Sequence, residues 1–314
     1  MTQGPFKVDG IHLEPASVGT ALTITRTGSG EMRFQDARVP DGLFLGNMAS
    51  LSTVAGVLVV GRAGAGAAYG TIQGALDDVP FSSSLTAPTV ILIMPGVYTE
   101  NPTINRAGLT LLALGRVVVT PALSAVPTIT VAAAVGSIPT SVSLVGLTVL
   151  QPNAGRAAVS VVGGAGSEVA ADGLRLERCE LVASGLGSFA LHADTVNRIE
   201  LWGCVAGLSD ATASVRINQC SGFRVFGGSL PSVQLEYNAA LPQPDETSSE
   251  YVLQGCVLVG DVLSSLVSEG SLRIASCPDV GDITLNGDRP VTLAEVTAGD
   301  VTVNGTTAAR ARSV

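Results

Sequence analysis

The sequence predicts an all-β protein built as a parallel β-helix, a solenoid whose coils stack strand upon strand. Three observations predict it. Short runs of alternating apolar and polar residues, separated by turn residues, dominate the chain, which is typical of strands. One apolar spacing recurs before every cysteine, and a single amphipathic segment stands ahead of the first recurrence. Helical periodicity is otherwise scarce, so helix-based folds are disfavoured.

The recurring pattern is apolar-x-apolar-x-x-Cys. Its cysteines are Cys179, Cys204, Cys220, Cys256 and Cys277. Leu114, Leu147 and Val296 take the cysteine position in three further copies. Successive copies lie from 16 residues apart (204 to 220) to 36 (220 to 256), as expected for solenoid coils with loops of variable length. Because free cysteine packs as a small hydrophobe, we expect five buried, reduced thiols on one side of the apolar interior of the solenoid, which we call the bore.

Disulfides and metal ligation are weaker interpretations of these cysteines. Their number is odd and no signal-peptide core precedes them, which disfavours a disulfide framework. No C-x-x-C occurs, and His12 and His192 have no matching ligands in the sequence. We therefore expect no metal and no cofactor.

Residues 56–79, "GVLVVGRAGAGAAYGTIQGALDDV", have the strand, glycine-rich turn and helix of a phosphate-binding loop. Neither fingerprint of such loops is complete. Tyr69 stands where a dinucleotide fold needs its third glycine, and no Gly-Lys-Ser/Thr is present. A nucleotide site is therefore disfavoured.

The same segment predicts a lid for the solenoid. Ile72, Ala75, Leu76 and Val79 fall at i, i+3, i+4 and i+7, one face of a helix over 71–79. Thr71 is a good helix-capping residue and Pro80 a terminator. Since the end of a β-helix exposes unpaired strand edges, we expect Ile72 and Leu76 to cover it.

The remaining segments complete the domain organisation. Residues 1–60 do not follow the coil pattern and are predicted to form a small N-terminal β-rich head. The β-helix then spans 61–306, and 307–314 form a short basic tail. A proline-bearing polar insert, 238–251, is predicted to be the longest loop.

Composition restricts the partners. The net charge is −9, the pI is about 4.7, and Lys/Arg clusters are absent, which disfavours nucleic-acid binding. No apolar run reaches the roughly 18 residues of a membrane span. Aromatic residues make up 4% of the chain, with Trp202 the only tryptophan, so few side chains are available to stack on sugars. Only 14% of residues are charged, which favours a surface covered by partners.

The segments "YGTIQGALDDVP" and "VILIMPGVYTEN" resemble the start of pectin-lyase-like right-handed parallel β-helix proteins, in which a cap helix precedes the first coil. The resemblance covers about 68–114. Gly96, Tyr98 and Glu100 match a motif of pectin esterases, but the segments "QDTL", "DFIFG" and "LGRPW" that carry their catalysis are missing. Polygalacturonase motifs are missing too, and we expect Glu100 to brace the turn after Gly96.

Carboxylates on neighbouring coils could still form a catalytic pair without a linear motif. The candidates are Glu177, Glu180 and Glu200, with Arg175 and Arg198 as further candidates for a lyase. The alternative is that these are ordinary outward-facing polar residues, which alternate with apolar ones along a strand.

A head at one end of a β-helix resembles phage virion proteins such as tailspikes and capsid decorations. The resemblance implies a non-enzymatic structural protein of a tailed-phage virion, made in the host cytoplasm. Its expected partners are capsid or tail proteins and itself, as a homotrimer. A polysaccharide-degrading tailspike, or a carbohydrate esterase or lyase, is the first alternative. An adhesin that binds host surface glycan is the second.

Overall fold

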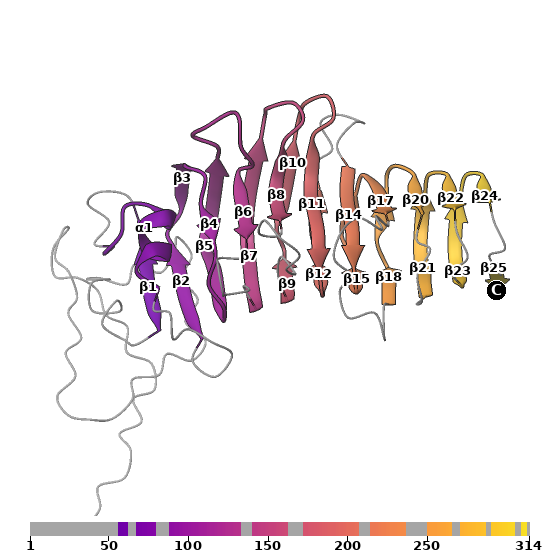
Figure 1. Ribbon diagram of the computed structural model, residues 1–314, viewed down its shortest axis with the longest axis horizontal. Helices are drawn as coiled ribbons and strands as arrows, with labels where there is room; N and C mark the ends of the chain where they lie inside the picture. Colours follow the sequence, from indigo (N-terminus) through magenta and orange to yellow (C-terminus); the bar gives the residue numbers. More distant parts are fainter. Residues whose placement is uncertain are drawn as a thin grey trace, which may run out of the picture. The chain divides into compact units, whose positions relative to one another are not determined.

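The computed structural model describes residues 56–61, 67–79, 88–132, 140–162, 172–206, 214–236, 250–265, 271–286, 290–304 and 309–312. Its strands follow one another along a single stack and pair in parallel (Figure 1). The fold is a right-handed parallel β-helix, since parallel strands joined by crossovers take this hand. No described helix has the length and apolar composition needed to cross a bilayer.

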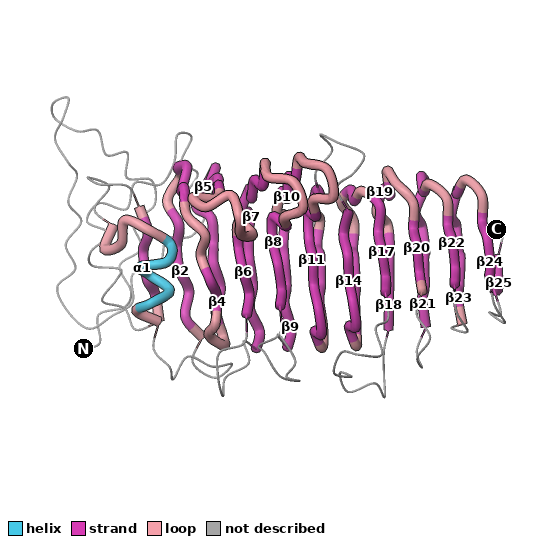
Figure 2. The backbone as a smooth tube through the Cα atoms, turned by 45° about the horizontal axis from the view of Figure 1, so that its top comes forward, coloured by secondary structure: helices cyan, strands magenta, loops and turns pink. Residues whose placement is uncertain are grey.

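A full coil contributes to three faces of the solenoid. Figure 2 shows the coils following one another along the stack. The first face contains β1 (Val57–Val60), β2 (Thr89–Ile93), β9 (Asp172–Glu177), β12 (Ile199–Trp202), β15 (Gly222–Phe226), β18 (Glu250–Gln254), β23 (Val291–Ala298) and β25 (Ala309–Arg312). The second face contains β3 (Gly96–Thr99), β10 (Glu180–Ala183), β13 (Val205–Ala206), β16 (Ser229–Leu230) and β19 (Val257–Leu258). The third face contains β4 (Thr103–Ile104), β6 (Ile129–Ala132), β8 (Ala157–Val162), β11 (Phe189–Val196), β14 (Ser214–Cys220), β17 (Ser232–Glu236), β20 (Val262–Ser264), β22 (Ile283–Asn286) and β24 (Val301–Asn304).

Four strands join the first and second faces. They are β5 (Leu109–Thr120), β7 (Thr140–Gln151), β21 (Ser271–Val280) and β23, which continues past the bend to Ala298. Because they pass from one face to the other without a break, the two faces form one 16-stranded sheet, whereas the third face is a separate 9-stranded sheet.

Inward-facing side chains form continuous apolar columns along the stack. One column of the first face consists of Leu111, Leu144, Leu176, Leu201, Val225, Leu253 and Ile274, which are paired in register. None of them is more than 1% exposed. Burial of a side chain this size contributes about 2 kcal/mol. Every second residue of a strand must therefore be apolar, which explains the alternating runs of the sequence.

A left-handed residue marks the bend between the first and second faces. These residues are Gly146, Arg178, Gly203, Gly227, Gly255, Ser276 and Glu295, with φ between 52° and 70°. The residue that follows each of them turns into the bore. We call these following residues the bend column: Leu147, Cys179, Cys204, Gly228, Cys256, Cys277 and Val296.

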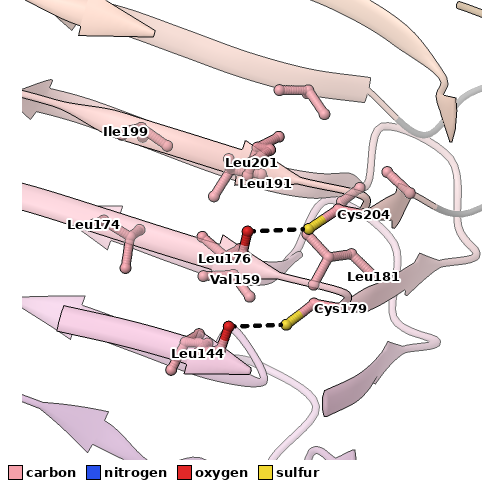
Figure 3. Close-up of a cluster of buried hydrophobic side chains, with 14 of the residues drawn as sticks. Leu144, Val159, Leu174, Leu176, Cys179, Leu181, Leu191, Ile199, Leu201 and Cys204 are labelled. Atoms are coloured by element: carbon pink, nitrogen blue, oxygen red, sulfur yellow. Dashed lines mark hydrogen bonds between the residues drawn. The ribbon is translucent and has the colours of Figure 1, made fainter. Parts of the chain in front are cut away.

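The thiols of the bend column are reduced and buried, as predicted (Figure 3). Cys179 Sγ lies 3.3 Å from the carbonyl oxygen of Leu144, and Cys204 Sγ lies 3.3 Å from that of Leu176. In both cases the thiol donates to the coil before its own. Cysteine therefore fills the position as a small apolar group and also supplies a weak donor for a buried carbonyl.

Two members of the predicted alignment were wrong. Cys220 is buried and reduced, but it ends β14 on the third face, opposite Val196, and its Sγ donates to Gly222. Gly228 holds the bend position of that coil, where a Cβ would collide with the carbonyl oxygen of Cys204. In the earlier coil the partner of Leu147 is Val117, because the register of β5 shifts after Leu112; Leu114 is only half-buried.

The lid is α1 (Ile72–Asp77), which lies against β1, β2 and β4. Ile72 and Leu76 are 0% and 3% exposed, whereas Asp77 and Asp78 face solvent. Thr71 Oγ1 accepts a hydrogen bond of 3.0 Å from Gly74 N, which satisfies one free amide of the first turn. The predicted capping helix is confirmed, although its α-helical part is shorter than 71–79.

Glu100 holds the lid in place. Its two carboxylate oxygens accept hydrogen bonds of 2.8 Å each from the backbone amides of Ile72 and Gln73. The expectation that Glu100 braces the turn after Gly96 was therefore wrong, because its carboxylate reaches the helix instead. A phosphate-binding loop would present these same amides to its ligand. Here a side chain of the protein occupies them.

Both boundaries of the predicted β-helix move outward. β1, assigned to the head, pairs with β2 and belongs to the first face. β25, assigned to the tail, pairs with β23. Gly281-Asp282 and Gly299-Asp300 occupy the same position in two successive coils, 18 residues apart (299 − 281). The same spacing places Ala309 opposite Val291, so the predicted tail joins the stack. Residues 1–55, the rest of the predicted head, lie outside the described residues, as do 238–249 of the predicted loop.

Candidate functional site

The outer side of the first face carries two rows of polar and aromatic side chains. In one row Arg175, Glu200 and Arg224 stand opposite one another on β9, β12 and β15. In the other row Glu177, Trp202 and Phe226 do the same. We call these six residues the first-face strip. They share a surface because residues two apart on a strand point to the same side.

Trp202 and Phe226 form an aromatic platform at the centre of the strip. Their ring centroids are 4.3 Å apart with an interplanar angle of 29°, and both side chains are partly exposed. The guanidinium of Arg175 stands 5.0 Å from the centroid of the Trp202 ring. A stacked pair of this kind is stabilised by about 1 kcal/mol beyond its burial. The Trp202 ring therefore lies between the Phe226 ring and the Arg175 guanidinium, and both aromatic side chains remain partly exposed.

Each carboxylate of the strip has a donor beside it. Glu177 pairs with Arg175 at 3.0 Å and with Arg178 at 3.5 Å. Glu200 accepts a hydrogen bond of 3.2 Å from Trp202 Nε1. These contacts hold both carboxylates alongside the platform.

The structure brings together two of the three carboxylates considered for catalysis. Glu177 and Glu200 lie on neighbouring strands of the first face. Glu180 follows the bend, so it lies on the second face, where Thr148 Oγ1 donates to it at 3.1 Å. The left-handed residue Arg178 separates Glu180 from Glu177, because it turns the chain onto the second face one residue after Glu177.

A pocket of about 240 Å³ adjoins the strip. It is lined by Ser141, Ser143, Gly173, Leu174, Arg175, Arg198 and Glu200. The two arginines proposed from the sequence for lyase chemistry thus share one pocket with one of the carboxylates.

Reasoning from the sequence missed the pairing of the two aromatic residues. Trp202 and Phe226 are 24 residues apart (226 − 202), and only the length of the coil places one on the other. Aromatic residues are few, at 4% of the chain, but two of them are stacked on each other here.

A second polar group lies on the third face, around His192. Its Nε2 is 3.5 Å from Asp194 Oδ1, which also accepts from Asn218 Nδ2 at 3.1 Å. Burial acts to raise the pKa of Asp194, but His192, Asn218 and the charge of Arg216 outweigh it and hold that pKa below its usual value. His192 therefore has a partner that the sequence did not predict, while His12 lies outside the described residues.

Metal and thiol chemistry have little support in the described ranges. No group of three or more His, Cys, Asp or Glu side chains there is arranged to hold a metal ion. Burial raises the pKa of Cys220 to about 12, which keeps it protonated and unreactive.

No protein-family model matches the chain, and no curated protein matches it. Among solved structures it is similar to the pectin methylesterase from carrot, at 13% sequence identity and a TM-score of 0.48, over 82% of this chain and 88% of that one. It is also similar to the deglycosylated pectin methylesterase from Aspergillus niger, at 18% identity and a TM-score of 0.36, over 82% and 90% of the two chains. These likenesses concern the fold alone.

Proposed function

We propose that the first-face strip binds a saccharide chain and that the protein does so without catalysis. The aromatic platform of Trp202 and Phe226 carries this proposal. The partly exposed atoms of the two rings offer apolar contact to the C–H groups of a sugar. The guanidinium and carboxylate groups beside it offer the donors and acceptors that sugar hydroxyls require.

The arrangement of the carboxylates supports binding over hydrolysis. Glycoside hydrolysis needs two carboxyl groups that flank one bond, one of them free to give up a proton. Glu177 and Glu200 instead lie on the same side of a ligand placed on the sheet. Each is also engaged, Glu177 with two arginines and Glu200 with the indole N–H.

The setting we propose is a tailed-phage virion, where the protein is a capsid decoration or a spike and forms a homotrimer. The low charged fraction of 14% and the predicted head support this setting. Such a protein would hold host surface glycan while the head contacts capsid or tail proteins. Removing 1–55, which leaves β1 in place, should abolish incorporation into particles, and light scattering should give three chains per assembly.

A panel of soluble neutral and acidic polysaccharides in affinity electrophoresis tests the binding. At least one should retard the protein, and Trp202→Ala should weaken that binding about tenfold or more, as for an aromatic hot spot. Phe189→Ala is the matched control, because Phe189 is an aromatic residue of the third face that stacks on His192. Equal retardation of both variants, or none of the wild type, would refute the proposal.

The carbohydrate-degrading alternative has its own test. We expect no release of reducing ends, unsaturated products or methanol from any member of the panel, including pectin. Turnover that Glu177→Gln or Glu200→Gln abolishes, and Glu180→Gln leaves intact, would replace binding by catalysis at the same strip.

A further inference from the structure

We infer that the pocket beside the strip receives an anionic substituent of the bound saccharide: a carboxylate, a sulfate or a phosphate. The inference rests on the proposed function and adds the chemical class of the ligand. It depends on the pocket's charge, on its open floor and on its position relative to the aromatic platform.

The charge of the pocket is not balanced. Arg175 is paired with Glu177, and Glu200 is bonded to the indole of Trp202. The guanidinium of Arg198 has neither a hydrogen bond nor an ion pair with any residue that the structure describes. Arg175 and Arg198 outnumber Glu200 in the lining, so one positive charge is left over at Arg198. A guanidinium has five N–H donors in a planar fork that matches carboxylate, sulfate and phosphate oxygens.

The floor of the pocket is kept open by Gly173. Its φ is +82°, and a Cβ there would lie 3.4 Å from Arg198 Nη2 and 3.6 Å from Ser141 N. Any side chain at Gly173 would therefore grow between the guanidinium and the neighbouring strand. The hydroxyls of Ser141 and Ser143 line the same space and add neutral donors.

The pocket and the platform can contact one ligand. Arg198 directly precedes β12, and Trp202 lies four residues further along, about 13 Å for an extended chain. Arg175 lines the pocket and also stands over the Trp202 ring, so it connects the two sites. A saccharide lying along β12 would place one ring on the platform and a charged substituent beside Arg198. This requires an oligosaccharide longer than a single sugar.

Calorimetry with a matched pair of ligands tests the inference. The probes are a hexauronate prepared from alginate and its carboxyl-reduced, neutral counterpart, with sulfated and phosphorylated hexasaccharides as arms that identify the anion. The wild type should bind the best anionic probe about tenfold tighter than the neutral one, with the difference shrinking at high salt. Arg198→Gln should remove this preference, because it should weaken the anionic probe much more than the neutral one.

Arg273→Gln is the matched control, because Arg273 is an exposed arginine on β21 of the same face, beyond β15 and β18. It should keep the full preference. Equal affinity for charged and neutral probes in the wild type, or a preference that survives Arg198→Gln, would overturn the anionic pocket while saccharide binding stands. Failure of the wild type to bind any probe or panel member would overturn both.

Discussion

Replacing Gly228 by alanine isolates the cost of the close approach at the bend. Gly228 has a φ of +88°, and its Cβ would collide with the carbonyl oxygen of Cys204. That oxygen accepts a hydrogen bond of 2.9 Å from Ser229 N, which is part of the ladder between the two coils. Alanine can be accommodated only if the two coils move apart and this bond breaks.

The magnitude follows from three contributions. Left-handed backbone costs alanine about 1 kcal/mol. A buried carbonyl left without its donor costs about 1–3 kcal/mol, and overpacking adds a similar amount. We therefore expect Gly228→Ala to lower the free energy of unfolding by about 5 kcal/mol.

Gly203→Ala is the matched control. Gly203 lies in the same bend of the preceding coil with a φ of +58°, but nothing is within 4 Å of its Cβ position. It should lose only the left-handed cost, about 1 kcal/mol. Urea unfolding followed by circular dichroism compares the two midpoints. Equal midpoints would mean that the close approach at Gly228 carries no energy and that the bend column has been aligned wrongly.

Three further predictions concern the thiols, the lid helix and the carboxylate of Asp194. In native protein all five thiols should resist a water-soluble thiol reagent because they are buried, and burial also raises the pKa of Cys220 to about 12. All five should react once the protein is unfolded in guanidinium. Rapid labelling of the native protein would contradict their burial. Leu76→Asp should uncover the first coil and cause aggregation measurable by light scattering, whereas exposed Asp77→Asn should stay soluble; equal behaviour would exclude a lid. Because the folded pKa of Asp194 is lowered, its stabilising contribution is present above about pH 4 and lost as pH falls through that lowered pKa. The unfolding free energy of Asp194→Asn should therefore fall less steeply with acid than that of the wild type, and parallel curves would contradict this.

The coil pattern was readable from the sequence because burial dictates it. Alternating apolar residues and a small residue after each bend are required by the columns of the bore, so four of the five cysteines fell in their predicted places. Cys220 shows the limit of this reasoning. Val215 and Ile217 give β14 the same apolar spacing, although β14 belongs to another face.

A left-handed residue precedes each bend position between the first and second faces, but Thr195 on the third face has the same conformation directly before Val196. At Arg178, Ser276 and Glu295 that residue is not glycine, so composition does not reveal it. Misplacing Cys220 divided the interval from 204 to 256 into 16 and 36 residues, whereas the true position at 228 divides it into 24 and 28. With that error, Phe226 could not be placed beside Trp202, and the platform was hidden.

The attachment of α1 by Glu100 has a consequence for the order of events during synthesis. The lid is made before the coil that secures it, because Glu100 and Thr103, which bond to Ile72, Gln73 and the Gln73 side chain, emerge from the ribosome about thirty residues later. Until they emerge, the helix is too short to persist alone. Closure of the N-terminal end must therefore wait for the second coil, so the nascent chain completes its first coil and its lid in one step.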